Sequence, residues 1–81
     1  MIIVLAGNRL EASDWAEDNN INPARYRVIY DYAEMIHMRP DNNEIQLVGS
    51  WSENERMIEV VNYLMKTDWR HILRRQLNEK L

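Results

Sequence analysis

The chain has 81 residues, the size of one small domain, and contains no cysteine. It therefore has no disulfide, and no thiolate for a zinc site or for nucleophilic catalysis. Hydrophobic residues make up 46% of the sequence and charged residues 28%, a balance typical of a globular domain rather than a disordered chain. Glycine occurs only at Gly7 and Gly49, although an average usage of about 7% would give roughly six.

The formal net charge of -3 is unevenly distributed along the chain. Residues 1–65 carry five basic and eleven acidic side chains, whereas residues 66–81 carry five basic and two acidic ones. An acidic body argues against nucleic acid as a partner, because non-specific binding needs a broad positive field. No apolar run approaches the ~20 residues of a membrane span, and the first residues lack the charged start of a signal peptide. These features predict a cytoplasmic protein without a membrane partner.

Three short segments have the composition of β-strands. Residues 2–6 form a continuous apolar run rich in β-branched side chains, which indicates a parallel strand covered on both faces. Residues 25–30 and 44–48 are the second and third predicted strands. Polar residues alternate in the third strand, at Glu44 and Gln46, and indicate that one of its faces is less completely covered.

Helical patterns follow the first two strands. The spacing of apolar residues predicts a helix from about Arg9 to Asn19, stopped by Asn19 and Asn20 in a left-handed turn. Asp31 is placed to cap a second, short helix that runs through Met38, and Pro40 prevents that helix from continuing.

The last third of the chain is helical in pattern. Ser52 and Glu55 match a capping box ahead of a helix that continues through Met65. We expect a break or kink at Thr67 and Asp68 before a basic terminal helix, although a single continuous helix is an alternative. The chain is accordingly divided into a small α/β domain of residues 1–66 and a helix of residues 67–81 that packs on it or serves association.

This order of elements predicts an α/β fold. Strands that alternate with helices form parallel sheets joined by right-handed crossovers. We expect a minimal three-stranded parallel sheet of the Rossmann-like or flavodoxin-like type, followed by an amphipathic basic helix.

The two glycines mark a short internal repeat. Residues 5–11 and 47–53 both read Leu, small apolar, Gly, small polar, large, any residue, Glu, and both join a strand to a helix. In open α/β sheets ligands bind beyond the carboxyl ends of the strands, and glycine permits a close approach of the backbone. If the first and third strands are neighbours, these turns form one candidate site for a nucleotide or phosphate group. Its residues are Gly7, Asn8, Arg9, Gly49, Ser50 and Trp51.

Other patterns give little support for catalysis or for a cofactor. There is no G-x-G-x-x-G motif and no Walker lysine, so the glycines are also explained as simple turn residues. His37 and His71 are far apart in the sequence and have no cysteine partners, which makes a poor set of metal ligands. No serine lies in a G-x-S-x-G turn. The sequence therefore predicts no catalytic residue, no metal and no cofactor.

The basic terminal helix carries an apolar stripe that must be buried somewhere. It can pack on its own domain, on a second copy or on a partner. Trp51, which follows a glycine turn, is also hard to place in a core. The predicted interaction surface consists of Trp51, Trp69, Arg70, Ile72, Leu73, Arg74 and Leu77.

Two turn motifs resemble a group of small uncharacterised proteins encoded by bacteriophages of actinobacteria. Those proteins open with a strand ending in Ala-Gly-Asn and carry a later Val-Gly-Thr/Ser-Trp turn. The matching residues are Ile3 to Asn8, Glu11-Ala12, Trp15-Ala16 and Val48 to Trp51, within a resemblance over roughly residues 2–65. Asn20 stands where such proteins have Gly. The resemblance implies a phage origin and a compact α/β fold, without an assigned activity, cofactor or site.

Two functions remain as hypotheses. The leading one is a non-catalytic interaction protein that binds a host protein or a second copy of itself as a possible homodimer. The alternative is a module that binds a nucleotide or phosphate group at the two glycine turns.

Overall fold

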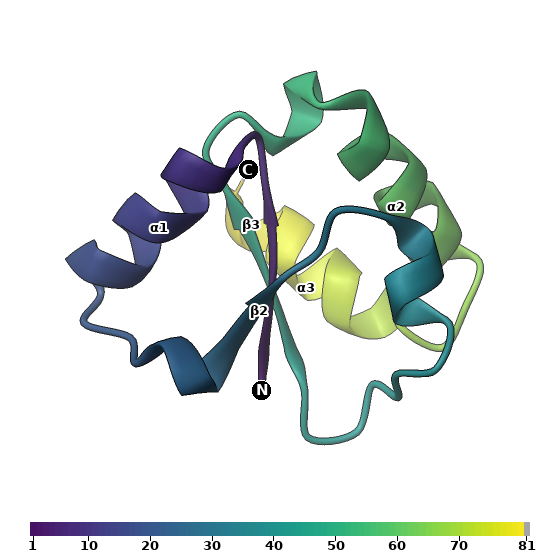
Figure 1. The fold of residues 1–81 in the computed structure, drawn as a ribbon. Helices are drawn as coiled ribbons and strands as arrows, with labels where there is room; N and C mark the ends of the chain where they lie inside the picture. Colours follow the sequence, from purple (N-terminus) through teal and green to yellow (C-terminus); the bar gives the residue numbers. More distant parts are fainter. Residues whose placement is uncertain (81) are drawn as a thin grey trace.

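The computed structural model describes the backbone of residues 1–80 and the side chains of residues 1–77. Strands β1 (Ile2–Ala6), β2 (Tyr26–Val28) and β3 (Glu44–Val48) form one parallel sheet in the order β2-β1-β3. Helix α1 (Arg9–Asp18) covers one face of the sheet, and α2 (Glu55–Met65) and α3 (Arg70–Lys80) cover the other (Figure 1). The predicted α/β fold with three parallel strands is confirmed. Its strand order equals that of the first three strands of flavodoxin-like sheets.

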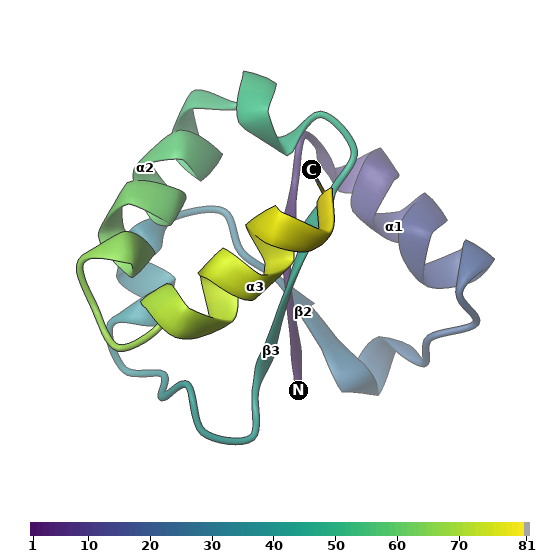
Figure 2. The same ribbon diagram turned by 180° about the vertical axis from the view of Figure 1, so that it is seen from behind.

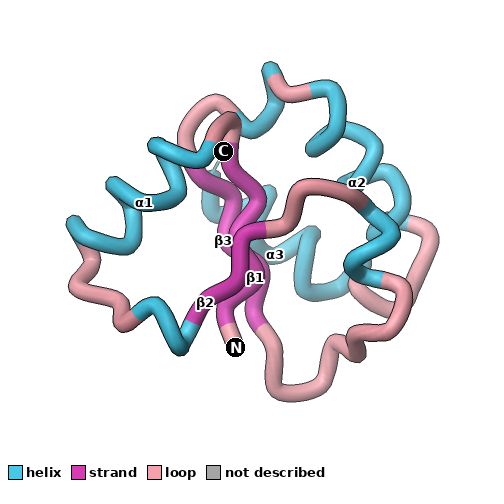
Figure 3. Tube along the Cα trace, in the orientation of Figure 1, coloured by secondary structure: helices cyan, strands magenta, loops and turns pink. Residues whose placement is uncertain are grey.

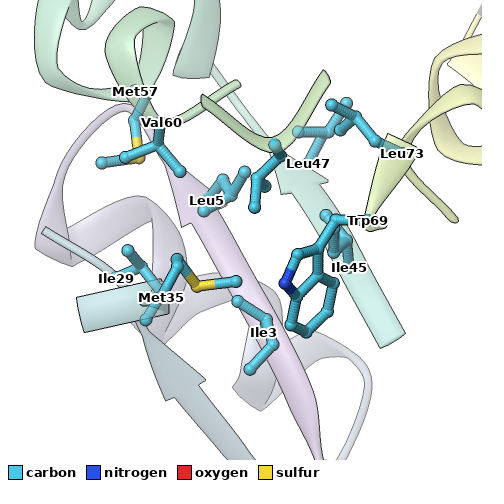
Figure 4. Packing of buried hydrophobic residues seen from close by; sticks show 11 residues of the cluster. Ile3, Leu5, Ile29, Met35, Ile45, Leu47, Met57, Val60, Trp69 and Leu73 are labelled. Carbon is cyan, nitrogen blue, oxygen red and sulfur yellow. The ribbon is translucent and has the colours of Figure 1, made fainter. Parts of the chain in front are cut away.

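The central strand β1 separates two hydrophobic cores. Successive side chains of a strand point to opposite faces, so Ile3 and Leu5 enter the larger core and Val4 and Ala6 the smaller one. The larger core lies between the sheet and α2 and α3 (Figure 4). The smaller core is closed by α1 through Ala12. Residues Ile3 to Ala6 are buried, as expected for a strand covered on both faces.

Helix α1 begins and ends close to its predicted limits. Asn8 caps its start by accepting a hydrogen bond from the Glu11 backbone N–H at 2.9 Å. Asn20 has a φ of 55°, and the Ile21 N–H donates to the Ala16 carbonyl at 2.8 Å. This left-handed turn confirms the predicted stop, because it satisfies a carbonyl that the helix itself leaves unpaired.

The second strand is shorter than predicted. It covers Tyr26–Val28 instead of residues 25–30, because Pro23–Arg25 form a 3-10 turn before it. Ile29 still pairs with β1, donating its N–H to the Val4 carbonyl at 3.1 Å, and is buried. After Ile29 the chain leaves the sheet.

The predicted helix from Asp31 to Met38 is also corrected. Only Tyr32–Met35 are helical, as one 3-10 turn in a long connection from β2 to β3 (Figure 3). Asp31 caps this turn as predicted, and Glu34 completes a capping box by accepting from the Asp31 N–H at 3.0 Å. The turn stays short because Met35 is buried under α2 and Pro40 prevents continuation.

Helix α2 is capped by Asn54, not by the predicted Ser52. Trp51–Glu53 form a 3-10 turn, which places Ser52 in an exposed position inside that turn. The Asn54 side chain accepts from the Arg56 N–H at 3.0 Å and donates to the Gly7 carbonyl at 3.0 Å. One amide group thus starts α2 and ties it to the end of β1.

The break between α2 and α3 is confirmed. The Thr67 hydroxyl donates to the Leu64 carbonyl at 2.9 Å and accepts from the Trp69 N–H at 3.3 Å, so it ends one helix and starts the next. Helix α3 then crosses over β3 and lies in front of it in Figure 2. Trp69 and Leu73 are 3% and 0% exposed within the larger core, so α3 belongs to the fold.

Candidate functional site

The two glycine turns lie side by side, as predicted from the repeat. Because β1 and β3 are neighbours, both turns sit at the carboxyl edge of the sheet. Their contact is so close that a Cβ built on Gly7 would lie 2.2 Å from the Ser50 Oγ atom. The sequence therefore located this meeting point correctly.

The place between the turns is filled by a side chain of the protein itself. The carboxylate of Glu11 accepts a hydrogen bond from the Ser50 backbone N–H at 2.8 Å and from the Ser50 hydroxyl at 2.7 Å. A Cβ on Gly49 would lie 2.1 Å from the Glu11 Oε2 atom. The absence of side chains at the two glycines thus makes room for an internal carboxylate.

The other residues of the predicted ligand site have roles within the fold. The Asn8 side chain caps α1, and Gly7 presents its carbonyl to Asn54. Trp51 is half-buried and packs against the larger core. Arg9 is exposed, and its side chain forms no ion pair within 4.0 Å among the residues that the structure describes.

Hydrogen bonds keep Glu11 in its charged form. The bond from the Ser50 hydroxyl has the largest effect in lowering the pKa of Glu11 below its ordinary value of 4.5. The Ser50 backbone N–H and the Gly7 backbone lower this pKa further, while partial desolvation opposes them. Glu11 is consequently a carboxylate at neutral pH.

Glu11 is the residue of this site that the sequence interpretation did not assign. It occupies the last position of the internal repeat, and that position was the available signal. The repeat is not a functional duplication, however, because the equivalent Glu53 is exposed in the 3-10 turn before α2.

The predicted interaction surface on α3 is only partly available. Trp69 and Leu73 are inside the core, which corrects their assignment as surface residues. Ile72 and Leu77 are half-buried against the same core, whereas Arg70 and Arg74 are exposed. The apolar stripe therefore packs on the protein's own domain, and not on a second copy or a partner.

The largest hollow among the described residues lies elsewhere, between the segment 35–41 and the first turn of α3. Its volume is about 760 Å³. We name it the α3 hollow, and its main lining residues are Ile36, Met38, Arg39, Asp41, Asp68, Arg70 and Ile72. A second depression of about 380 Å³ shares His71 and Ile72 with it and continues along α3 to Arg75.

Sequence interpretation placed Arg70 and Ile72 in an interaction surface but missed the facing segment. The predicted helix includes Ile36 and Met38, and the exposure of Ile36 was not predicted from it. The available signal was Pro40, which keeps this segment from becoming a regular helix. In the structure Ile36 is 52% exposed at the edge of the α3 hollow.

Chemistry-bearing clusters are scarce in the described part of the chain. Among the described residues, no group of three or more His, Asp or Glu side chains is arranged to hold a metal ion. Within the same residues, no helix is both long and apolar enough to cross a membrane.

Fold and geometry together define a small α/β protein with a closed carboxyl edge and a hollow beside its last helix. No protein-family model, no curated protein and no solved structure matches this chain. Its function must therefore be inferred from the contacts, exposure and charges of its own residues.

Proposed function

We propose that this protein is a non-catalytic interaction protein that binds a segment of another protein in the α3 hollow. The observation that carries the proposal is the position of Ile36, which is 52% exposed at the edge of the largest hollow of the described chain. Large apolar side chains that line a concave surface are typical of sites where a partner supplies the missing cover.

The apolar part of the α3 hollow is suited to one anchoring side chain. Met38 and Ile72 are half-buried and line the hollow together with Ile36. Beneath them lie the buried Met35 and Trp69, which belong to the larger core. Methionine adapts to irregular shapes, so this surface can accommodate an aliphatic or aromatic side chain of a partner.

The hollow is lined by charged side chains of both signs. Arg39 and Arg70 line it and form no ion pair within 4.0 Å among the described residues. Asp41 and Asp68 line it as well. Carboxylates flanking an apolar anchor would pair with the arginines and speed association through long-range attraction.

A different protein is favoured over a second copy as the occupant. Self-association was predicted through the apolar stripe of the terminal helix. However, Trp69 and Leu73 of this stripe are buried in the core of their own domain. The resemblance to phage proteins supports a bacterial host protein as the partner, with the host cytoplasm as the place of action. Nucleic acid is disfavoured because the whole chain has a net charge of -3.

The alternative function, binding of a nucleotide or phosphate group at the glycine turns, is less well supported. The Ser50 N–H and hydroxyl that would bind an anion already bind Glu11. An entering anion would also meet a carboxylate of the same charge.

Affinity capture from an actinobacterial host lysate with matched variants tests the proposal. Ile36→Asp places a charge in the α3 hollow, whereas Leu10→Asp changes a residue that is 69% exposed on α1, across the sheet. We expect at least one host protein to be enriched by the wild type and by Leu10→Asp, and to be lost, by tenfold or more, with Ile36→Asp. Circular dichroism checks that both variants are folded.

The proposal is contradicted if Ile36→Asp still captures every protein that the wild type captures, or if no host protein is captured at all. A second arm uses Arg70→Glu. It should weaken binding of the captured protein and reduce the dependence of its affinity on salt, because a charge pair at the rim is lost.

A further inference from the structure

Glu11 forms a bridge between two parts of the chain that are 39 residues apart in sequence. Its backbone lies in the first turn of α1, and its carboxylate accepts from both hydrogen-bond donors of Ser50, the N–H and the hydroxyl, in the turn after β3. Ser50 directly precedes the 3-10 turn Trp51–Glu53, which leads into α2. The bridge therefore fixes the start of one helix against the approach to another.

The backbone around the bridge is shaped for it. Gly49 has a φ of +57°, a left-handed conformation. A Cβ atom at this position would collide with the Glu11 Oε2 atom, so the absence of a side chain leaves room for the carboxylate. A Cβ on Gly7 would lie 2.8 Å from the Glu11 Oε2 atom and 2.9 Å from the Ser50 carbonyl carbon. Any side chain at either glycine would push the carboxylate or the Ser50 turn out of place.

We propose that Glu11 is a proton-sensitive latch that, when ionised, holds the turn of Ser50 and Trp51 against the carboxyl edge and, when protonated, loosens it. The ionised carboxylate accepts two charge-assisted hydrogen bonds from Ser50, one at each oxygen. A protonated carboxyl group keeps one good acceptor for the Ser50 N–H and turns its O–H towards the Ser50 hydroxyl oxygen, so the hydroxyl must rotate and both bonds become weaker, neutral ones.

No formal charge competes with the hydrogen bonds in this latch. The nearest charged residues along α1 are Arg9 and Asp14, and Glu53 belongs to the facing 3-10 turn. Arg9 forms no ion pair with Glu11 among the described residues, and the pKa of Glu11 is shifted by hydrogen bonds and desolvation and by no neighbouring charge. The state of the latch thus depends on the proton of Glu11 itself.

The direction of the pH dependence follows from the hydrogen bonds. They lower the pKa of Glu11 in the folded protein below 4.5, so the ionised latch stabilises the folded state above that pH. This contribution disappears as the pH falls through the folded pKa. The latch is closed at neutral pH and opens in acid.

Amide and indole NMR signals report on the latch directly. In the wild type, the Ser50 amide shift should titrate with a midpoint below 4.5, the ordinary value for a glutamate. Glu11→Gln should abolish that titration and, already at pH 7, should shift the Trp51 indole signal while those of Trp15 and Trp69 stay in place. Glu17→Gln, on the exposed side of the same helix, serves as the control and should behave as the wild type.

Three results would overturn the latch. One is a Ser50 amide that does not titrate with Glu11, and another is a midpoint at or above 4.5. The third is a Trp51 indole signal that is identical in the wild type and Glu11→Gln at pH 7. Because the comparison of Trp51 is made at neutral pH, global unfolding in acid cannot imitate release.

Discussion

At the scale of single residues, Glu11 explains both glycines of this chain. Sequence interpretation placed Gly7 and Gly49 at equivalent turns and assigned the space between them to an external anion. The structure fills that space with an internal anion instead. An acidic residue in a first helical turn is already accounted for by the helix dipole, so the sequence alone could not indicate that this one turns towards Ser50.

The link between Gly49 and Glu11 is testable by a double-mutant cycle. Gly49→Ala requires alanine at a φ of +57° and displaces the Glu11 carboxylate. The left-handed conformation alone should lower the free energy of unfolding by about 1–2 kcal/mol, and loss of the latch adds to this cost. In a Glu11→Ala background the conformational cost alone should remain, as measured by urea denaturation. Equal costs in both backgrounds would show that the glycine does not serve the carboxylate.

At the scale of elements, strands β1 and β3, the end of α1 and the break between α2 and α3 were readable from the sequence, whereas the limits of β2 and the capping of α2 were not. Residues 2–6 and 44–48 match β1 and β3 because a continuous apolar run marks the first, an alternating pattern marks the third, and a glycine follows each. The predicted capping box at Ser52 was wrong because the turn after Gly49 continues as a 3-10 helix. Asn54 is itself a favoured capping residue, and its bond to the Gly7 carbonyl adds a tertiary contact that the sequence does not display.

The capping assignment predicts unequal effects for two neighbouring substitutions. Asn54→Ala removes the bond to the Arg56 N–H and the bond to the Gly7 carbonyl. It should lower the free energy of unfolding by about 1 kcal/mol, within the usual range for helix caps. Ser52→Ala, at an exposed position, should change it by less than about 0.5 kcal/mol. Thermal and urea denaturation of the two variants measure both effects, and a larger loss for Ser52→Ala would favour the original capping box.

The connection from β2 to β3 was the least predictable element. The sequence indicated a helix from Asp31 to Met38, but only one 3-10 turn forms. Local capping by Asp31 and Glu34 was sufficient to start a turn and too weak to extend it, since Met35 must be buried under α2. The irregular segment that results is what leaves Ile36 exposed.

At the scale of the whole molecule, the carboxyl edge of the sheet is closed whereas the α3 hollow is open. The carboxyl edge between β1 and β3, where ligands of such sheets usually bind, is closed by Glu11 and Ser50. The α3 hollow is open and is lined by apolar side chains and by charged side chains of both signs. The order of strand and helix patterns predicted the fold class, but this division depends on which face each side chain takes in three dimensions.

Changes in the amide NMR spectrum on addition of the captured partner test most directly whether a protein partner binds in the α3 hollow. We predict that titration with the partner perturbs the amides of residues 36–41 and 68–72 most strongly, with the signals of residues 7–9 and 49–51 nearly unchanged. Perturbations concentrated at the two glycine turns, with the α3 hollow unaffected, would contradict it.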